Sequence, residues 1–157
     1  MKYELTTHSL SESLQFGEQF GRILRGGETI ELASDLGGGK TVLVKGIARG
    51  LGFKGEVTSP TFTISRIYKL RDGLELHHFD FYRLDSSDIV AVELAEVVGD
   101  PTIIVAVEWA GHAGKSMPAK RIRIEITATS DNTREISVES LDTRFDYVIQ
   151  GLQHAKH

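Results

Sequence analysis

The stretch Ser34-Asp35-Leu36-Gly37-Gly38-Gly39-Lys40-Thr41 decides which fold this chain is expected to adopt. Residues 29–33, directly before it, alternate between polar and apolar side chains as a β-strand does. Residues 41–49, directly after it, are expected to form a helix. A strand, a glycine-rich turn and a helix that opens with Lys-Thr form the context of a phosphate-binding loop, here with serine in place of the usual first glycine.

The residue types in this stretch suit the binding of a polyphosphate. Gly37, Gly38 and Gly39 permit positive φ angles and carry no Cβ atom, so backbone N–H groups can converge on phosphates at the positive end of a helix dipole. Lys40 can place its ammonium on the β and γ phosphates, and the Thr41 hydroxyl suits Mg²⁺, which prefers hard oxygen ligands. The residues of this stretch and directly after it that are expected to contact nucleotide are Asp35, Leu36, Gly37, Gly38, Gly39, Lys40, Thr41 and Val42.

Acidic residues elsewhere in the chain could complete a metal site. Glu108 follows the continuous apolar run 103–107, and phosphate-binding loop proteins place an acid at the end of such a strand. Asp80 lies in a stretch whose alternation puts it on the same strand face as His78. A metal site built on His77 and His78 is disfavoured, because adjacent strand residues point to opposite faces. Trp109, the only tryptophan, is either a core residue or faces a partner, and the sequence leaves both open.

The remaining segments predict a mixture of helices and strands. We expect an edge strand at 2–7, a helix from a capping box at Ser9 and Glu12 to Gly26-Gly27, a hairpin of 61–70 with 74–82, a helix from about 88 to 99, a buried strand at 102–109, a hairpin of 120–129 with 135–139, and a helix at about 142–157. The predicted fold is α/β: a three-layer, single-domain P-loop NTPase fold spanning 1–157. Its central sheet should be mixed and mainly parallel, with the phosphate-loop strand beside the 103–107 strand and the hairpins adding antiparallel strands.

Composition bounds the class of protein. A chain of 157 residues fits one domain, and it contains no cysteine, so it has no disulfide framework and no thiolate metal site. The first residues lack the apolar core of a signal peptide, and no apolar run is long enough to span a membrane, so we expect a soluble, cytoplasmic protein. The net charge of −4 argues against a large basic surface that binds nucleic acid unaided.

Four stretches together resemble the TsaE (YjeE) family of bacterial P-loop ATPases, which serve the threonylcarbamoyl modification of adenosine 37 in tRNA. The matching stretches are Asp35-Leu36-Gly37-Gly38-Gly39-Lys40-Thr41, Val57-Thr58-Ser59-Pro60-Thr61-Phe62-Thr63, His78-Phe79-Asp80-Phe81-Tyr82-Arg83-Leu84 and Val107-Glu108-Trp109. Their order, their spacing and the chain length agree with the family over about residues 5–140. The family usually has glycine where this chain has Ser34 and a second threonine where it has Val42.

The resemblance implies ATP and Mg²⁺ binding, slow ATP hydrolysis, and work in a complex with the proteins TsaB and TsaD, of which TsaD carries the transfer chemistry. Contact with tRNA would be indirect, through that complex. By match, Lys40, Asp80 and Glu108 would be the catalytic residues: Lys40 would hold phosphates and Asp80 would support hydrolysis. Thr41 and Glu108 would bind Mg²⁺. Residues 58–63 resemble the switch-like loop of the family, and Trp109 would be a functionally important residue of the nucleotide site.

Two other functions remain open at this point. The local pattern also permits a small-molecule P-loop kinase, although the chain has no obvious arginine-rich lid and no large insertion for an acceptor. A nucleotide-gated binding module without hydrolysis is the other alternative, because Ser34 is unfavourable where φ must be positive. A GTPase is disfavoured, since the only asparagine, Asn132, lies in a predicted turn. If hydrolysis needs an arginine from this chain, Arg83 is a candidate.

Overall fold

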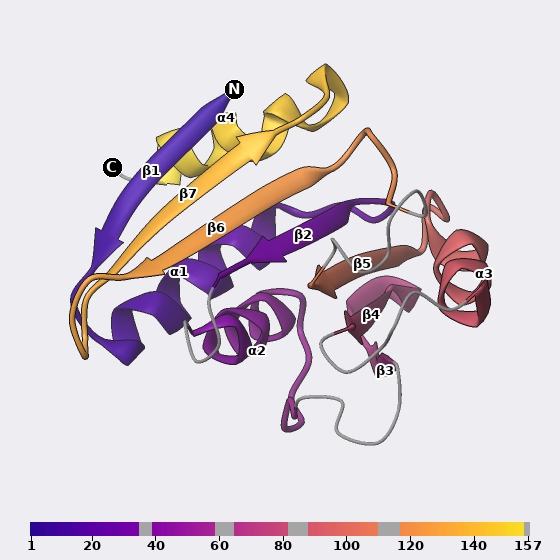
Figure 1. Cartoon of the computed structure of the whole chain (residues 1–157), viewed down its shortest axis with the longest axis horizontal. Coiled ribbons are helices and arrows are strands. Elements are labelled where there is room, and N and C mark those ends of the chain that lie inside the picture. The colour runs from indigo at the N-terminus through magenta and orange to yellow at the C-terminus, as the bar shows by residue number, and fades with distance from the viewer. Residues whose placement is uncertain (35–38, 59–64, 82–87, 110–116, 156–157) are drawn as a thin grey trace.

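A computed structural model of the chain describes residues 1–34, 39–58, 65–81, 88–109 and 117–155. Its centre is a seven-stranded sheet with the strand order β1-β7-β6-β2-β5-β4-β3 (Figure 1). The four inner strands are β6 (Ile122–Ala128), β2 (Thr29–Ala33), β5 (Ile103–Glu108) and β4 (Glu75–Asp80), and neighbours among them run parallel. The outer strands β1 (Lys2–Thr7), β7 (Arg134–Ser140) and β3 (Ser65–Lys69) pair antiparallel with their neighbours.

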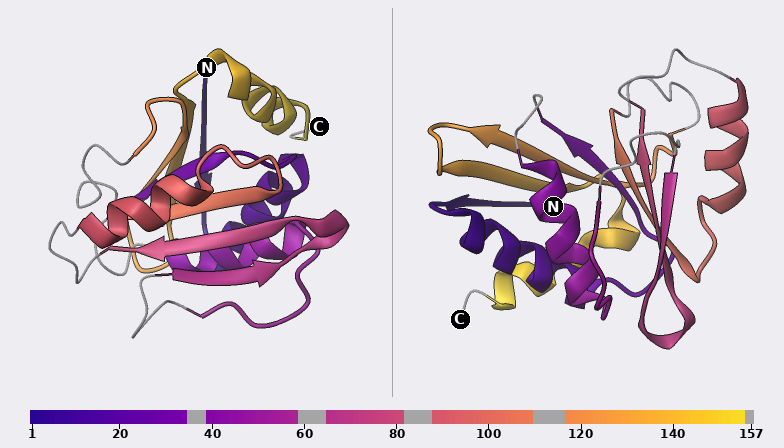
Figure 2. Two further views of the ribbon diagram at one scale, coloured as in Figure 1. Left: turned by 90° about the vertical axis from the view of Figure 1, so that its right-hand side faces the viewer. Right: turned by 90° about the horizontal axis from the view of Figure 1, so that it is seen from below.

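Helices lie on both faces of the sheet, which gives three layers (Figure 2). The helices are α1 (Leu10–Ile23), α2 (Lys40–Gly50), α3 (Asp88–Val97) and α4 (Asp146–Ala155), with short 3₁₀ turns at Arg71–Gly73 and Thr143–Phe145. One core cluster, which includes Phe20, Ile47 and Ile149, joins the sheet to α1, α2 and α4. A smaller cluster, which includes Phe79 and Leu94, joins the opposite face to α3. Among the described residues, no helix is long and apolar enough to cross a membrane.

The sequence-based expectations for the sheet are confirmed. β2 lies beside β5 in parallel register, with Thr29 opposite Val105. Both expected hairpins form antiparallel pairs, β3 with β4 and β6 with β7. All six residues of β5 are buried, as the continuous apolar run predicts. The mixed sheet with a parallel centre and antiparallel additions is therefore the predicted one.

Several predicted element boundaries need correction. Helix α1 ends at Ile23 rather than at Gly26-Gly27, because Leu24 is extended and its N–H bonds to Gly21 O. The Ser9 side chain caps α1 as expected, but Glu12 accepts its hydrogen bond from the backbone of His8, not from that of Ser9. The last helix begins at Asp146, after the 3₁₀ turn. Residues 61–64 of the expected strand 61–70 lie outside the described residues.

Charged residues on the inner strands are paired where they approach the core. Glu31 of β2 is 9 % exposed and accepts hydrogen bonds from Arg121 Nε at 2.7 Å and Arg123 Nε at 3.2 Å. These arginines belong to a group of basic residues in the second half of the chain, Lys115, Lys120, Arg121 and Arg123. Because both arginines bond to Glu31, they are ion-pair partners of the sheet rather than a free basic patch.

Helices α1 and α2 pack through glycines. A Cβ atom on Gly46 would lie 2.4 Å from Leu14 O and 2.8 Å from the Cα of Gly17, and one on Gly21 would lie 2.3 Å from Ile47 O. Real Cβ atoms do not approach backbone atoms this closely, so only glycine permits the two helix backbones to touch. This contact fixes α2, whose first residue is Lys40, relative to the sheet.

We expect Gly46→Ala to destabilise the protein although alanine is normally the better helix residue by about 1 kcal/mol. Overpacking against rigid backbone typically costs about 1–3 kcal/mol, so the net loss in the free energy of unfolding should be of that order. Denaturant unfolding measures it. The matched control is Gly151→Ala in α4, where the nearest atoms, at 2.9–3.1 Å, all belong to the Ile23 side chain and can move. Equal stability of Gly46→Ala and the wild type would contradict the glycine-mediated contact.

Candidate functional site

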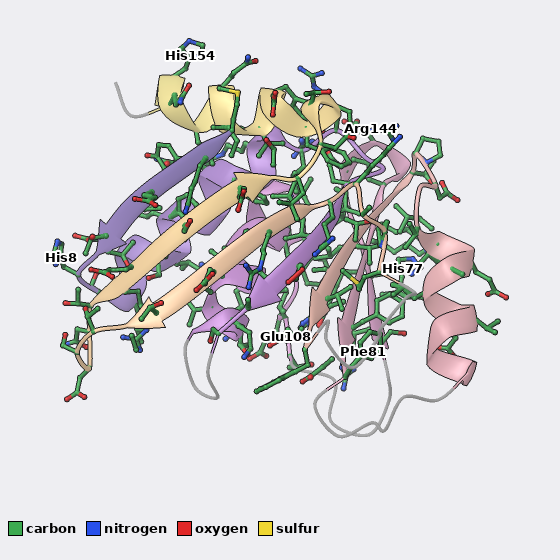
Figure 3. All side chains as sticks on the ribbon, turned by 45° about the horizontal axis from the view of Figure 1, so that its top comes forward. His8, His77, Phe81, Glu108, Arg144 and His154 are labelled. Atoms are coloured by element: carbon green, nitrogen blue, oxygen red, sulfur yellow. The ribbon has the colours of Figure 1, made fainter. Side chains whose placement is uncertain are left out.

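Polar residues gather where the inner strands end. Asp80 is the last residue of β4 and Glu108 the last of β5, and the two lie opposite each other in register. On its other side, Glu108 lies opposite Leu32 near the end of β2, and Ser34 follows that strand. Figure 3 shows Glu108 and Phe81 at neighbouring strand ends, and Phe81 N donates to Glu108 O at 3.2 Å. The carboxyl edge of a parallel sheet is where ligands of α/β proteins bind.

The N-terminus of α2 opens at this edge. Its N-cap residue, Gly39, has φ +102° and ψ 16°, a left-handed conformation that glycine adopts without strain. Glycine has no side chain with which to cap the helix, and the first turn, residues 40–43, contains no acidic residue. The N–H groups and the positive dipole end of α2 are therefore not compensated by α2's own side chains, which suits an anionic ligand.

Lys40 is held at this position in an unusual way. Its side chain is only 7 % exposed, and its Nζ donates to Ser34 O at 3.3 Å. The same Nζ lies 4.6 Å from the centre of the Trp109 ring, a cation–π distance. Trp109 itself has φ +60°, so the chain turns sharply as it leaves β5. The Ser34 carbonyl and the Trp109 ring are thus two of the groups that contact this ammonium beside the start of α2.

Glu108 is a buried carboxylate with a defined partner. Its side chain is 5 % exposed, and its Oε2 lies 2.6 Å from Nε2 of His78, whose side chain is fully buried. His77 lies on the other face of β4 and pairs with Glu75 at 3.0 Å. The prediction that the two histidines point to opposite faces is therefore confirmed, and they do not converge on one ligand.

The residues present fit a nucleotide phosphate chain with Mg²⁺. An open helix N-terminus with a buried lysine suits phosphates, and Thr41, Asp80 and Glu108 supply hard oxygen atoms at the same edge. The described residues contain no group of three or more His, Cys, Asp or Glu side chains that could hold a metal by themselves. That is compatible with Mg²⁺, which usually takes one or two protein carboxylates and completes its shell with water and substrate phosphates.

The structure places the predicted site residues in two groups. Gly39, Lys40, Thr41 and Val42 form the start of α2, while Asp80, Glu108 and Trp109 stand at the strand ends. Lys40 and Trp109 bridge the two groups. Asp35, Leu36, Gly37, Gly38, Arg83 and residues 59–63 of the switch-like loop lie outside the described residues.

Thr58, the described residue of the stretch expected to resemble a switch-like loop, is anchored to β3. Tyr68 Oη accepts a hydrogen bond from Thr58 N at 3.2 Å and donates to Thr58 O at 2.9 Å. Thr58 itself is exposed, whereas Val57 before it and Tyr68 are buried. Thr58 is therefore fixed by two hydrogen bonds to an edge strand.

Sequence reasoning missed Arg134. A Cβ on Gly39 would lie 3.6 Å from Arg134 Nε, so this guanidinium stands beside the start of α2. Its Nη1 donates to the carbonyl oxygens of Ser130 at 2.9 Å and Thr133 at 3.0 Å, which holds it at the tip of the β6–β7 hairpin. No local pattern around Arg134 indicates this neighbour, because only the pairing of β7 with β6 and of β6 with β2 brings it there.

Comparisons with known proteins agree with this geometry. The model of the family described as threonylcarbamoyl adenosine biosynthesis protein TsaE matches residues 7–136, which include every described residue of the site. The chain belongs to the TsaE family. The resemblance drawn from the sequence is thereby confirmed, and the match includes both the start of α2 and the ends of β4 and β5.

Individual TsaE relatives match over most of their length. The protein named tRNA threonylcarbamoyladenosine biosynthesis protein TsaE of Streptomyces coelicolor is 35 % identical over 138 residues, which are 83 % of this chain and 92 % of that protein. The protein of the same name from Treponema pallidum is 36 % identical over 136 residues, 84 % of this chain and 96 % of that one. The crystal structure of Bacillus subtilis YdiB superposes with a TM-score of 0.80 at 28 % identity and covers 100 % of this chain and 97 % of its own. The predicted fold class is thus confirmed.

We expect Gly39→Ala to weaken nucleotide binding without unfolding the protein. A Cβ at φ +102° introduces strain of about 1–3 kcal/mol and places a methyl group at the helix N-terminus where phosphates are expected. Isothermal titration with ATP measures the affinity. The control is Gly99→Ala, which has a similar positive φ, +85°, but no atom within 4 Å of the added Cβ. Gly99→Ala should bind ATP like the wild type, and wild-type ATP affinity in Gly39→Ala would contradict the prediction.

Proposed function

We propose that this TsaE protein binds ATP with Mg²⁺ and hydrolyses it in support of the threonylcarbamoylation of adenosine 37 in tRNA, acting together with TsaB and TsaD. The observation that carries the proposal is the meeting of three features at one sheet edge: the uncapped N-terminus of α2, the buried Lys40, and the paired strand ends Asp80 and Glu108. The printed names of its relatives, tRNA threonylcarbamoyladenosine biosynthesis protein TsaE, support the biological context.

The phosphates would be bound by backbone N–H groups of α2 and by Lys40. The first N–H groups of α2 would donate to phosphate oxygens, helped by the helix dipole. Lys40 would leave Ser34 O and the Trp109 ring and place its ammonium on the phosphates. Arg134 adds a second positive charge beside Gly39. Nucleotide binding is in this way coupled to Trp109, since the ring would lose its cation when the phosphates arrive.

Hydrolysis requires that charge on the phosphates be neutralised and that water be positioned. Mg²⁺, when bound, would supply charge neutralisation on the phosphate oxygens. Thr41 and Glu108 are the residues that would hold it. Asp80, at the neighbouring strand end, would accept a hydrogen bond from the water that attacks the γ-phosphorus, as the bond to the β–γ bridging oxygen breaks to give ADP and phosphate.

Partners fit this chemistry because P-loop sites often lack part of their charge stabilisation until a second protein binds. An arginine supplied to such a site can raise the rate by about 10³–10⁵. Arg134 is already engaged by the carbonyl groups of its own hairpin, and it lies by Gly39 rather than at the strand ends. We therefore expect slow hydrolysis by the isolated chain and faster hydrolysis with TsaB and TsaD.

We expect Lys40→Ala to abolish ATP hydrolysis and the formation of the modified nucleoside in a system reconstituted from this chain, TsaB, TsaD, tRNA and the threonylcarbamoyl donor. Phosphate release and nucleoside analysis of the tRNA by mass spectrometry are the readouts. Lys45→Ala is the matched control, since Lys45 is on the same helix but more than one turn away from its N-terminus. Nucleoside formation at the wild-type rate with Lys40→Ala would refute the proposal. ATP binding and modification without any turnover would instead favour a nucleotide-gated module.

A further inference from the structure

The contact between His78 and Glu108 is a buried polar pair on the adjacent strands β4 and β5. His78 is 0 % exposed and Glu108 is 4 % exposed, and the atoms Nε2 and Oε2 are 2.6 Å apart. The hydrogen bond joins Nε2 to the carboxyl group of Glu108, and in the tautomer that carries its hydrogen on Nε2 the imidazole is the donor. His78 stands opposite Ala106 in the β4–β5 register, and this small neighbour leaves room for the imidazole to lean toward Glu108, two residues further along β5.

Packing alone does not account for a histidine here. Its second ring nitrogen, Nδ1, is buried and has no hydrogen-bond partner among the described residues. A buried polar atom without a partner is unfavourable, and an apolar side chain such as leucine would occupy similar space without one. The single hydrogen bond to Glu108 is therefore the interaction for which the imidazole is needed.

We infer that His78 is a positioning residue, whose Nε2–H holds the Glu108 carboxylate in the orientation in which it binds Mg²⁺ with the nucleotide. The inference rests on the proposed function, because it takes Glu108 as part of the metal site. With Oε2 engaged by His78, the other carboxylate oxygen, Oε1, is left for the metal ion or one of its waters. Hydrogen bonds from surrounding residues orient metal-binding carboxylates in this way, and removal of such a partner typically lowers metal affinity about 10–100-fold.

Three variants separate positioning from packing. His78→Leu removes the donor but fills the core, His78→Gln keeps an N–H group near the place of Nε2, and His78→Asn keeps a polar amide that is too short to reach Glu108. The main readout is the affinity for Mn²⁺ with a non-hydrolysable ATP analogue, measured by electron paramagnetic resonance. Thermal unfolding without ligand and analogue affinity in EDTA show whether the fold and the phosphate site are intact.

We expect His78→Leu to bind Mn²⁺ about 10–100-fold more weakly than the wild type while its affinity for the analogue in EDTA stays within about threefold. His78→Gln should recover most of the metal affinity and His78→Asn should not. Wild-type Mn²⁺ affinity in His78→Leu would overturn the inference. If His78→Leu does not fold, the comparison of the two amides decides, and equal metal affinity of His78→Gln and His78→Asn would overturn it.

A double-mutant cycle with Glu108 shows whether His78 acts through this carboxylate. In a Glu108→Gln background the carboxylate is gone, so adding His78→Leu should change Mn²⁺ affinity by less than about twofold. An undiminished effect of His78→Leu in that background would contradict a role exercised through Glu108. If the wild type itself binds Mn²⁺ no more tightly with the analogue than without it, the proposed function fails, and this inference fails with it. If the wild type binds Mn²⁺ with the analogue and His78→Leu binds it equally well, the inference about His78 fails while the proposed function stands.

Discussion

The parallel pairing of β2 with β5, and of β5 with β4, is the constraint on which the rest of this structure depends. Parallel strands end at the same edge, so the register that sets Leu32 and Asp80 on either side of Glu108 also gathers the residues that follow those strands. Buried on both faces, β5 tolerates little slippage, because a shift by one residue would turn Glu108 toward the α3 side of the sheet. The position of the acidic residues is thus a consequence of the hydrophobic core.

The other half of the site depends on how α2 is held. Its backbone touches α1 through Gly17, Gly21 and Gly46, and its buried face, which includes Leu43 and Ile47, belongs to the main core cluster. The helix therefore presents its N-terminus to the sheet edge from a rigid position. Preorganised backbone donors of this kind lose little free energy to rearrangement when an anion binds, which is why a helix N-terminus is an effective phosphate site.

Local sequence patterns predicted the elements that carry strong periodicity. β2 was expected over the very residues that form it, since an alternating run meets a glycine-rich turn, and β5 was expected from its uninterrupted apolar residues. The predicted end of α1 was wrong because Leu24 continues the helical spacing and is buried, although its backbone is extended. The apolar spacing records that Leu24 is a core residue but not its backbone conformation, so the pattern could not place the end of the helix.

The site was predictable as a set of residues but not as a set of contacts. Lys40, Asp80 and Glu108 follow from a loop pattern and from acids at strand ends. The contacts of Lys40 with Trp109, of His78 with Glu108 and of Arg134 with the start of α2 depend on strand register and on side-chain conformation. These relations join segments distant in sequence, and no single segment contains the information that specifies them.

The most direct test of the central claim is the position of the metal and nucleotide in a crystal of this protein grown with Mn²⁺ and a non-hydrolysable ATP analogue. The account predicts an anomalous Mn²⁺ peak between the start of α2 and the end of β5, about 2 Å from the Thr41 hydroxyl oxygen and bound to Glu108 directly or through one water. It also predicts that Lys40 Nζ has left the Trp109 ring for the phosphates. A nucleotide on another face of the sheet, or a metal site without Thr41 and Glu108, would contradict it.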